Sequence, residues 1–135
     1  MPHGSMRLIL LLPLLLATGC QNDETVAAYG GGTGLWQLIE IDGKTFPARA
    51  TLGFPEPGRI AGAAPCNAYS GPMTAPYPWF DAGDIAVTRR ACPELAAETA
   101  FFDALTSMTL AEIAGDTLIL STPDGREMVF TRSQP

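Results

Sequence analysis

Residues 109–131, TLAEIAGDTLILSTPDGREMVFT, decide the fold class of this chain. Three short apolar-rich runs, 109–114, 117–121 and 127–131, are separated by Gly115-Asp116 and by Pro123-Asp124-Gly125. Such residues favour tight turns, and strands joined by tight turns pair antiparallel. The sequence therefore predicts a three-stranded antiparallel meander at the C-terminal end.

Further short strands are predicted upstream of the meander. Apolar-rich runs at 35–41, 50–54 and 85–88 are typical of strands, and Asp42-Gly43 favours a hairpin turn that leads into a return strand near 45–46. A second hairpin is expected where the turn at 55–58 leads into 59–62. The stretch 71–84 is rich in proline, glycine and aromatic residues, so we interpret it as an irregular edge strand or loop.

One helix is predicted at about 93–107. Pro93 suits the first helical position, and Leu95, Phe101 and Phe102 fall on one apolar face. At 100° per residue, Glu98 lies between Leu95 and Phe102 on that face, so its carboxylate needs a partner. Many strands around one helix indicate an α+β, mainly β fold, with a small, strongly curved antiparallel sheet or partly open barrel covered by the helix.

The N-terminus has the order of a secretory signal. Arg7 precedes an apolar run from Leu8 to Leu16, which is far shorter than the roughly 18 residues that a bilayer span requires. The following Ala17-Thr18-Gly19-Cys20 resembles the lipobox of bacterial lipoproteins, in which the cysteine is acylated and becomes the new N-terminus. An ordinary signal peptide that ends near a cysteine is the alternative. We interpret residues 1–19 as a signal peptide, 20–34 as a lipidated, flexible tether and 35–132 as the domain.

This interpretation implies a place in the cell. The expected location is the bacterial cell envelope, with a lipid anchor that carries acyl chains such as palmitate on Cys20. Gln21 after Cys20, rather than Asp, favours the outer membrane, facing the periplasm, by analogy with enteric bacteria. The formal net charge of −6 opposes a general electrostatic attraction to nucleic acid, so no nucleic-acid partner is expected.

The residue inventory excludes most catalytic chemistry. The only histidine, His3, lies in the predicted signal peptide, so the mature chain lacks an imidazole base and a histidine metal ligand. No Gly-x-Ser-x-Gly, GxGxxG or P-loop pattern is present. Acid and base work by carboxylates, for example Glu94 with Glu98 or Asp81 with Asp84, remains an alternative. We expect no enzyme activity, no cofactor and no metal site.

Two cysteines remain once Cys20 is assigned to lipid. Cys66 and Cys92 form an even pair in a chain exported to an oxidising compartment, which favours a disulfide. A redox or metal-binding thiol pair is the alternative, but no CxxC motif supports it.

Several segments together resemble the META domain family, the group that includes the HslJ-type heat-shock lipoproteins. The matching residues are Trp36, Leu38, Gly43, 50–54, 58–71 with its Cys66-Asn67, 85–93 with its Thr-Arg-x-x-Cys-Pro, Glu98, 101–105 and 115–120. The resemblance covers about residues 35–132. It implies a small, mainly β domain with one helix and a role in the envelope linked to stress or antibiotic tolerance. It implies no catalytic residues.

Two groups of residues are candidate sites. Asn67, Arg89 and Glu98 are expected to form a polar cluster, which either recognises a partner or ties loops to the core. We expect Glu98 to accept hydrogen bonds from Arg89 or from backbone amides near Cys66 and Asn67. A possible contact surface for a partner or for lipid headgroups consists of Tyr77, Trp79 and Phe80, although these rings alternatively cap the core.

The sequence thus predicts a non-catalytic envelope lipoprotein. Its monomeric domain is expected to act as an interaction or stress-protection module for an unidentified envelope protein. The alternative is a periplasmic small-ligand-binding domain with a pocket inside the curved sheet.

Overall fold

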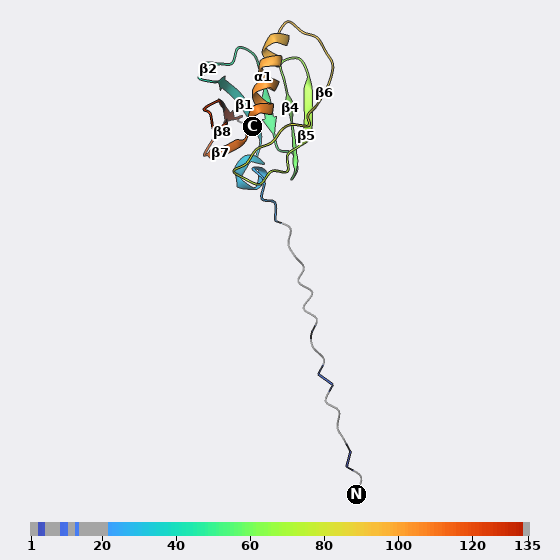
Figure 1. Ribbon diagram of the computed structural model, residues 1–135. Helices are drawn as coiled ribbons and strands as arrows, with labels where there is room; N and C mark the ends of the chain where they lie inside the picture. Colours follow the sequence, from blue (N-terminus) through green and yellow to red (C-terminus); the bar gives the residue numbers. More distant parts are fainter. Residues whose placement is uncertain (1–2, 5–8, 11–12, 14–21, 134–135) are drawn as a thin grey trace.

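The computed structural model describes residues 3–4, 9–10, 13 and 22–133 and shows one domain with the N-terminal segment leaving at one end (Figure 1). Cys20 and most of the predicted signal peptide lie outside the described residues. Within the described part of the chain, no helix has the length and apolar character needed to cross a membrane.

The predicted C-terminal meander is confirmed. It consists of β7 (Leu110–Ala114), β8 (Thr117–Ser121) and β9 (Glu127–Arg132), paired antiparallel in register across both turns. Gly115 and Gly125 adopt positive φ angles of 59° and 97°, which favour glycine in these turns. Every second residue of β8 and β9 is buried, so one face of the meander lines the core.

In the part of the chain that the structure describes, six strands precede the helix: β1 (Leu35–Ile41), β2 (Lys44–Thr45), β3 (Thr51–Gly53), β4 (Arg59–Ala63), β5 (Ala68–Pro72) and β6 (Ala86–Val87). The sheet is antiparallel with the order β6-β5-β4-β3-β1-β9-β8-β7, and β2 pairs with β1. Because β1 pairs with both β3 and β9, it joins the N-terminal half of the sheet to the meander. The sheet curls without closing, so β6 and β7 remain its two edges (Figure 1). This confirms the mainly β, partly open architecture.

The helix α1 (Leu95–Ser107) packs its buried residues into the core of the curled sheet (Figure 1). Phe101, fully buried, lies 5.6 Å from the Tyr69 ring and 6.3 Å from the Phe46 ring, measured between centroids. Trp36 and Phe130 are also fully buried. Large side chains therefore fill the space inside the sheet, where we expected a ligand pocket as the alternative function, and the hollows described below open at the surface.

The prediction of a flexible tether over residues 20–34 is wrong for residues 25–34, because this segment packs against the domain. Val26 is fully buried, and Ala27–Gly31 form a single π-helical turn, η1. The indole N–H of Trp36 donates a hydrogen bond to the carbonyl of Gly31 at 3.0 Å, and the Arg132 guanidinium lies 4.2 Å from the centre of the Trp36 ring. The folded unit therefore begins near Thr25 rather than Leu35.

The predicted irregular segment after β5 is confirmed, and it covers the β7 edge. The backbone of Phe80 donates to the carbonyl of Thr109 at 2.9 Å, and Ala111 donates to the carbonyl of Pro78 at 2.8 Å. A β-bridge joins Trp79 to Leu110 between these hydrogen bonds. The chain thus runs from β5 to the β7 edge and back to β6, and this path covers backbone groups of β7 that an open edge would expose.

Candidate functional site

A groove lies on the surface between α1 and the segment 85–91. It has a volume of about 640 Å³ and an open mouth. Its lining combines apolar side chains with two arginines and with the polar pair Asn67 and Glu98; the residues are Asn67, Ile85, Val87, Thr88, Arg89, Arg90, Ala91, Leu95, Glu98, Thr99 and Phe102. Leu95 was expected on the buried face of α1, but it is 48% exposed because it lines this open groove. Phe102 is half-buried.

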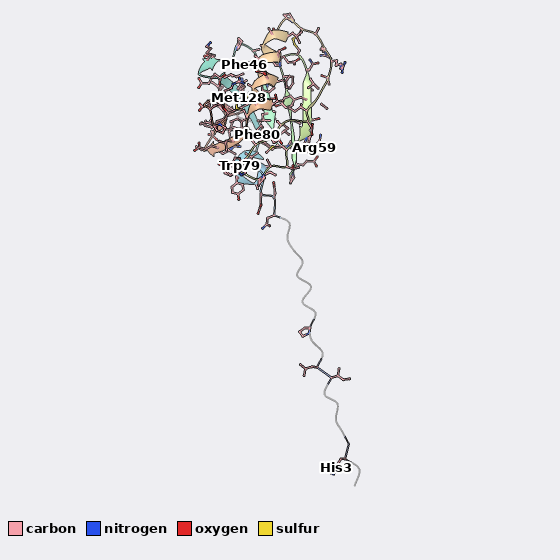
Figure 2. All side chains as sticks on the ribbon, in the orientation of Figure 1. His3, Phe46, Arg59, Trp79, Phe80 and Met128 are labelled. Atoms are coloured by element: carbon pink, nitrogen blue, oxygen red, sulfur yellow. A yellow bond between two sulfur atoms is a disulfide. The ribbon has the colours of Figure 1, made fainter. Side chains whose placement is uncertain are left out.

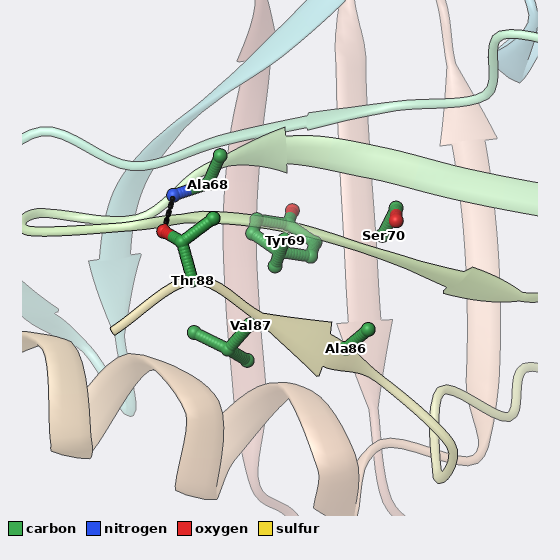
Figure 3. Close-up of a pocket in the computed structure, with 6 residues that line it drawn as sticks. All are labelled: Ala68, Tyr69, Ser70, Ala86, Val87 and Thr88. Carbon is green, nitrogen blue, oxygen red and sulfur yellow. Dashed lines mark hydrogen bonds between the residues drawn. The ribbon is translucent and has the colours of Figure 1, made fainter. Parts of the chain in front are cut away.

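The edge strand β6 forms one wall of this region. It pairs only two residues with β5, Val87 with Tyr69 and Ala86 with Ser70. Figure 3 shows the side chain of Val87 directed toward α1 and the hydroxyl of Thr88 accepting a hydrogen bond from the backbone N–H of Ala68 at 3.1 Å. A smaller hollow of about 270 Å³ lies along the same two strands. The groove therefore opens beside a short strand at the edge of the sheet.

Glu98 anchors the base of the groove. Only 5% of its surface is exposed, and its Oε1 accepts hydrogen bonds from the backbone N–H groups of Cys66 at 3.0 Å and Asn67 at 2.8 Å. Its Oε2 accepts from the amide Nδ2 of Asn67 at 2.7 Å. Three donors on a buried carboxylate satisfy both of its oxygens and offset its desolvation. The expected backbone partners of Glu98 are thus present.

Asn67 links this carboxylate to the segment that carries the arginines. Its Nδ2 also donates to the carbonyl of Arg90 at 2.9 Å, while its Oδ1 accepts from the backbone N–H of Arg90 at 2.6 Å and from the hydroxyl of Thr88 at 3.0 Å. All the hydrogen-bonding groups of the Asn67 side chain are used. The opposite orientation of the amide is unfavourable, because it would place its NH₂ against the backbone N–H of Arg90 and its oxygen against the Glu98 carboxylate and the Arg90 carbonyl.

A disulfide fixes the end of the same segment. Cys66 and Cys92 are bonded, with their Cα atoms 5.5 Å apart, which confirms the predicted pair. The segment between Thr88 and Cys92 is therefore held by the Asn67 side chain in its middle and by a covalent bond at its end.

Arg89 does not join the cluster as predicted. It is exposed in the groove lining, and it is the backbone of Arg90 that bonds to Asn67. Thr88 and Arg90, which do join the cluster, were not predicted as site residues. Alternation along an extended segment separates residue 89 from residues 88 and 90, but which side faces Asn67 depends on the pairing of β5 with β6, which the local sequence does not specify. Neither arginine forms an ion pair within the described residues, where the salt bridges involve Arg59, Arg126 and Arg132.

The three aromatic residues of the predicted contact surface lie in different environments. Trp79 is 56% exposed, whereas Phe80 is 2% exposed and belongs to the core, so Phe80 is not part of a contact surface. Phe80 points inward because its backbone pairs with β7, and alternation turns its neighbour Trp79 outward. Tyr77 is half-buried and stacks on Tyr29 with ring centroids 4.7 Å apart.

The geometry of the groove suits binding better than proton transfer. Both oxygens of Glu98 are occupied by protein donors, and the Oδ1 of Asp81 accepts from the backbone of Gly83 at 3.0 Å. Burial raises the pKa of Tyr69, whose hydroxyl donates to the carbonyl of Thr51 at 2.6 Å and so serves the core. The described residues contain no group of three or more potential metal-binding side chains.

Comparison with known proteins identifies a family and three solved structures of similar fold, including the two that follow. Residues 32–135 match the META domain. An NMR structure of a protein from Burkholderia xenovorans has a TM-score of 0.61 and 23% identity, over 84% of this chain and 92% of that one. A crystal structure of a DUF4847 family protein from Bacteroides vulgatus has a TM-score of 0.59 and 12% identity, over 78% and 96% of the two chains. No curated protein matches the sequence.

Proposed function

The chain belongs to the META domain family, and from that membership we propose that it is a bacterial envelope lipoprotein whose domain is a non-catalytic interaction or stress-protection module. The groove between α1 and the segment 85–91 is the part of the domain that binds the partner. The partner is an envelope protein that presents an acidic segment.

The lipid anchor is supported by the sequence before the domain. Ala17-Thr18-Gly19-Cys20 resembles a lipobox and follows an apolar run too short to span a bilayer. Stable anchoring requires more than one membrane-binding group, and several acyl chains on Cys20 would meet this requirement at a single residue. Gln21 favours the outer membrane, with the domain in the periplasm.

The non-catalytic role is supported by what the carboxylates already do. Glu98 is 5% exposed and accepts three hydrogen bonds from Cys66 and Asn67, so its carboxylate serves to hold this segment rather than to take a proton from a substrate. Histidine is absent after Cys20. The groove also lies at an open surface, where water is not excluded from a reacting group.

The observation that carries the binding role is the pair of arginines in a chain of net charge −6. Arg89 and Arg90 have no carboxylate partner among the described residues and lie beside the exposed apolar side chains of Val87 and Leu95. Guanidinium groups beside apolar surface suit a segment that carries both carboxylates and apolar side chains. The disulfide and Asn67 hold this segment in place before binding, which lowers the entropy cost of association.

The experiment compares two charge-reversal variants expressed in the source organism. Arg89→Glu/Arg90→Glu removes the cationic side of the groove, while Lys44→Glu/Arg59→Glu makes the same change in net charge on β2 and β4. Each protein is purified gently from the envelope and analysed by native mass spectrometry. We expect the wild type and the control to retain a protein partner that the groove variant loses, and the intact mass to include acyl chains on Cys20.

Three outcomes would contradict parts of this proposal. Equal partner retention by both variants would remove the groove from the binding site. A chain with an unmodified Cys20 in the mature protein would remove the lipid anchor. A bound small molecule of defined mass that only the groove variant loses would favour the alternative function, because a groove of about 640 Å³ lies within the range of small-molecule sites.

A further inference from the structure

Two exposed aromatic side chains lie at the end of the domain where the N-terminal segment leaves. Tyr29, in η1, is 55% exposed and stacks on Tyr77, and the backbone N–H of Tyr77 donates to the carbonyl of Glu24 at 2.6 Å. Trp79 lies two residues further along the same segment, and Figure 2 shows it at the tail end of the domain. These residues, Tyr29, Tyr77 and Trp79, form what we call the aromatic end.

The length of chain before this end limits where the domain can go. Val26 is fully buried, so at most the five residues 21–25 form a free chain between Cys20 and the domain, and the span from Cys20 to Val26 reaches roughly 20 Å when extended. A domain of about this size is roughly 30 Å or more across. If Cys20 is held at a bilayer surface, the aromatic end stays within roughly 20 Å of that surface. The opposite end of the domain is too far from Cys20 to contact the bilayer in its place.

The chemistry of the aromatic end fits the headgroup layer of a bilayer. Trp and Tyr gather at membrane interfaces because their rings are apolar and their N–H or O–H groups remain hydrated. The charged residues nearest in sequence, Asp23, Glu24 and Asp81, are acidic, and the one guanidinium recorded beside η1, that of Arg132, is already bonded to the carbonyl of Gly30. Because the chain also carries a net charge of −6, electrostatic attraction to anionic lipid is not expected here. Contact through two exposed rings is weak by itself, but a short tether gives it a high effective concentration.

We propose that the aromatic end rests on the headgroup layer of the membrane that holds the acyl chains of Cys20, with Trp79 and Tyr29 inserted at the interface. This inference rests on the lipid anchor of the proposed function. It assigns the second exposed surface of the domain to the bilayer and fixes the orientation of the groove relative to the membrane.

The test uses the acylated chain reconstituted into vesicles of zwitterionic phosphatidylcholine, with and without bromine atoms on the acyl chains. Bromine quenches an indole only at short range. Trp36 is fully buried and present in both proteins, so the emission difference between the wild type and Trp79→Phe reports on Trp79 alone. We expect the emission assigned to Trp79 to lose most of its intensity in brominated vesicles. In vesicles without bromine, we expect this emission to lie at a shorter wavelength than in buffer without vesicles. Adding phosphatidylglycerol is expected to weaken the quenching, because of the acidic residues.

The control places an indole at the other end of the domain. Leu95 is 48% exposed at the start of α1, which lies at the end of the domain opposite η1 (Figure 1). In the variant Trp79→Phe/Leu95→Trp, we expect brominated lipid to leave the new emission nearly unchanged. Equal quenching at both positions, or quenching at neither, would overturn the inference. The intact mass of the same sample separates the two proposals: acyl chains without quenching overturn only membrane docking, and a missing acyl mass overturns the anchor and the docking with it.

Discussion

The substitution Glu98→Gln tests the cluster beneath the groove most directly. A glutamine retains one oxygen for the backbone N–H groups of Cys66 and Asn67, which lie 3.0 and 2.8 Å from Oε1. Its new NH₂ group replaces Oε2, which lies 2.7 Å from the donor Nδ2 of Asn67. Two donors then face each other, and Asn67 cannot rotate its amide without turning its NH₂ toward the backbone N–H of Arg90 and its oxygen toward the Arg90 carbonyl.

The magnitude follows from these contacts. One hydrogen bond to a charged group is lost, at about 1.5–3 kcal/mol, and the two remaining bonds lose the assistance of the charge. Burying a neutral amide costs less than burying a carboxylate, which offsets part of the loss. We expect the free energy of unfolding to fall by about 3 kcal/mol, which corresponds to a decrease of roughly 12 °C in melting temperature for a domain of about this size.

The assay is thermal unfolding at pH 7 followed by circular dichroism, together with amide hydrogen exchange at Cys66 and Asn67. The exchange of these two amides is expected to accelerate more than that of β8 and β9. Glu112→Gln is the matched control, because Glu112 is exposed on β7 and its substitution is expected to change stability by less than about 0.5 kcal/mol. A Glu98→Gln melting temperature within about 2 °C of the wild type would refute the reasoning.

Three further predictions concern the disulfide, the core and a turn. Replacing Cys66 and Cys92 by serine is expected to lower the free energy of unfolding by roughly 3.5 kcal/mol in denaturant titrations, from the entropy of a loop that spans 26 positions, and an unchanged midpoint would contradict this. Tyr69→Phe leaves a buried carbonyl of β3 without its O–H donor and is expected to cost about 1–3 kcal/mol. Burial raises the pKa of Tyr69, so its phenolate absorbance is expected only when alkali unfolds the domain, and absorbance before unfolding would count against the buried bond. The hydrogen bond from the backbone N–H of Glu127 lowers the pKa of Asp42, so its carboxylate stabilises the domain above about pH 4. This contribution is lost as pH falls through the lowered pKa. The melting temperature of Asp42→Asn is expected to be slightly below that of the wild type at pH 7 and equal to it near pH 2, and a difference that stays constant with pH would argue against this.

The parts of the fold that could be predicted are those encoded by neighbouring residues. Turn residues at 115–116 and 123–125 fix two hairpins, and the buried positions of β8 and β9 follow from alternation. The position of Glu98 follows from the helical repeat, because residues three and four apart share a face. Its need for a partner then follows from the cost of burying a carboxylate.

The parts that could not be predicted depend on contacts between distant residues. Nothing around Val26 marks it as buried; it is held because the next turn supplies a carbonyl to the Trp36 indole and because Arg132 reaches back from the end of β9. Phe80 likewise points inward only because its backbone pairs with β7. Arg90 rather than Arg89 bonds to Asn67, because the pairing of β5 with β6 determines which residue of the segment faces Asn67.

The groove and the aromatic end together determine how the domain is oriented on the membrane. The tail leaves at the aromatic end, whereas α1 begins at the other end of the domain, where Leu95 contributes to the groove (Figure 1). A domain that rests on the bilayer at Trp79 therefore turns this end of the groove toward the periplasm, where an envelope protein can reach it. Glu98 and the disulfide keep the segment that carries Arg89 and Arg90 in place at that end. Loss of membrane docking should then weaken partner retention without changing the affinity of the groove itself, whereas charge reversal at the arginines should weaken both.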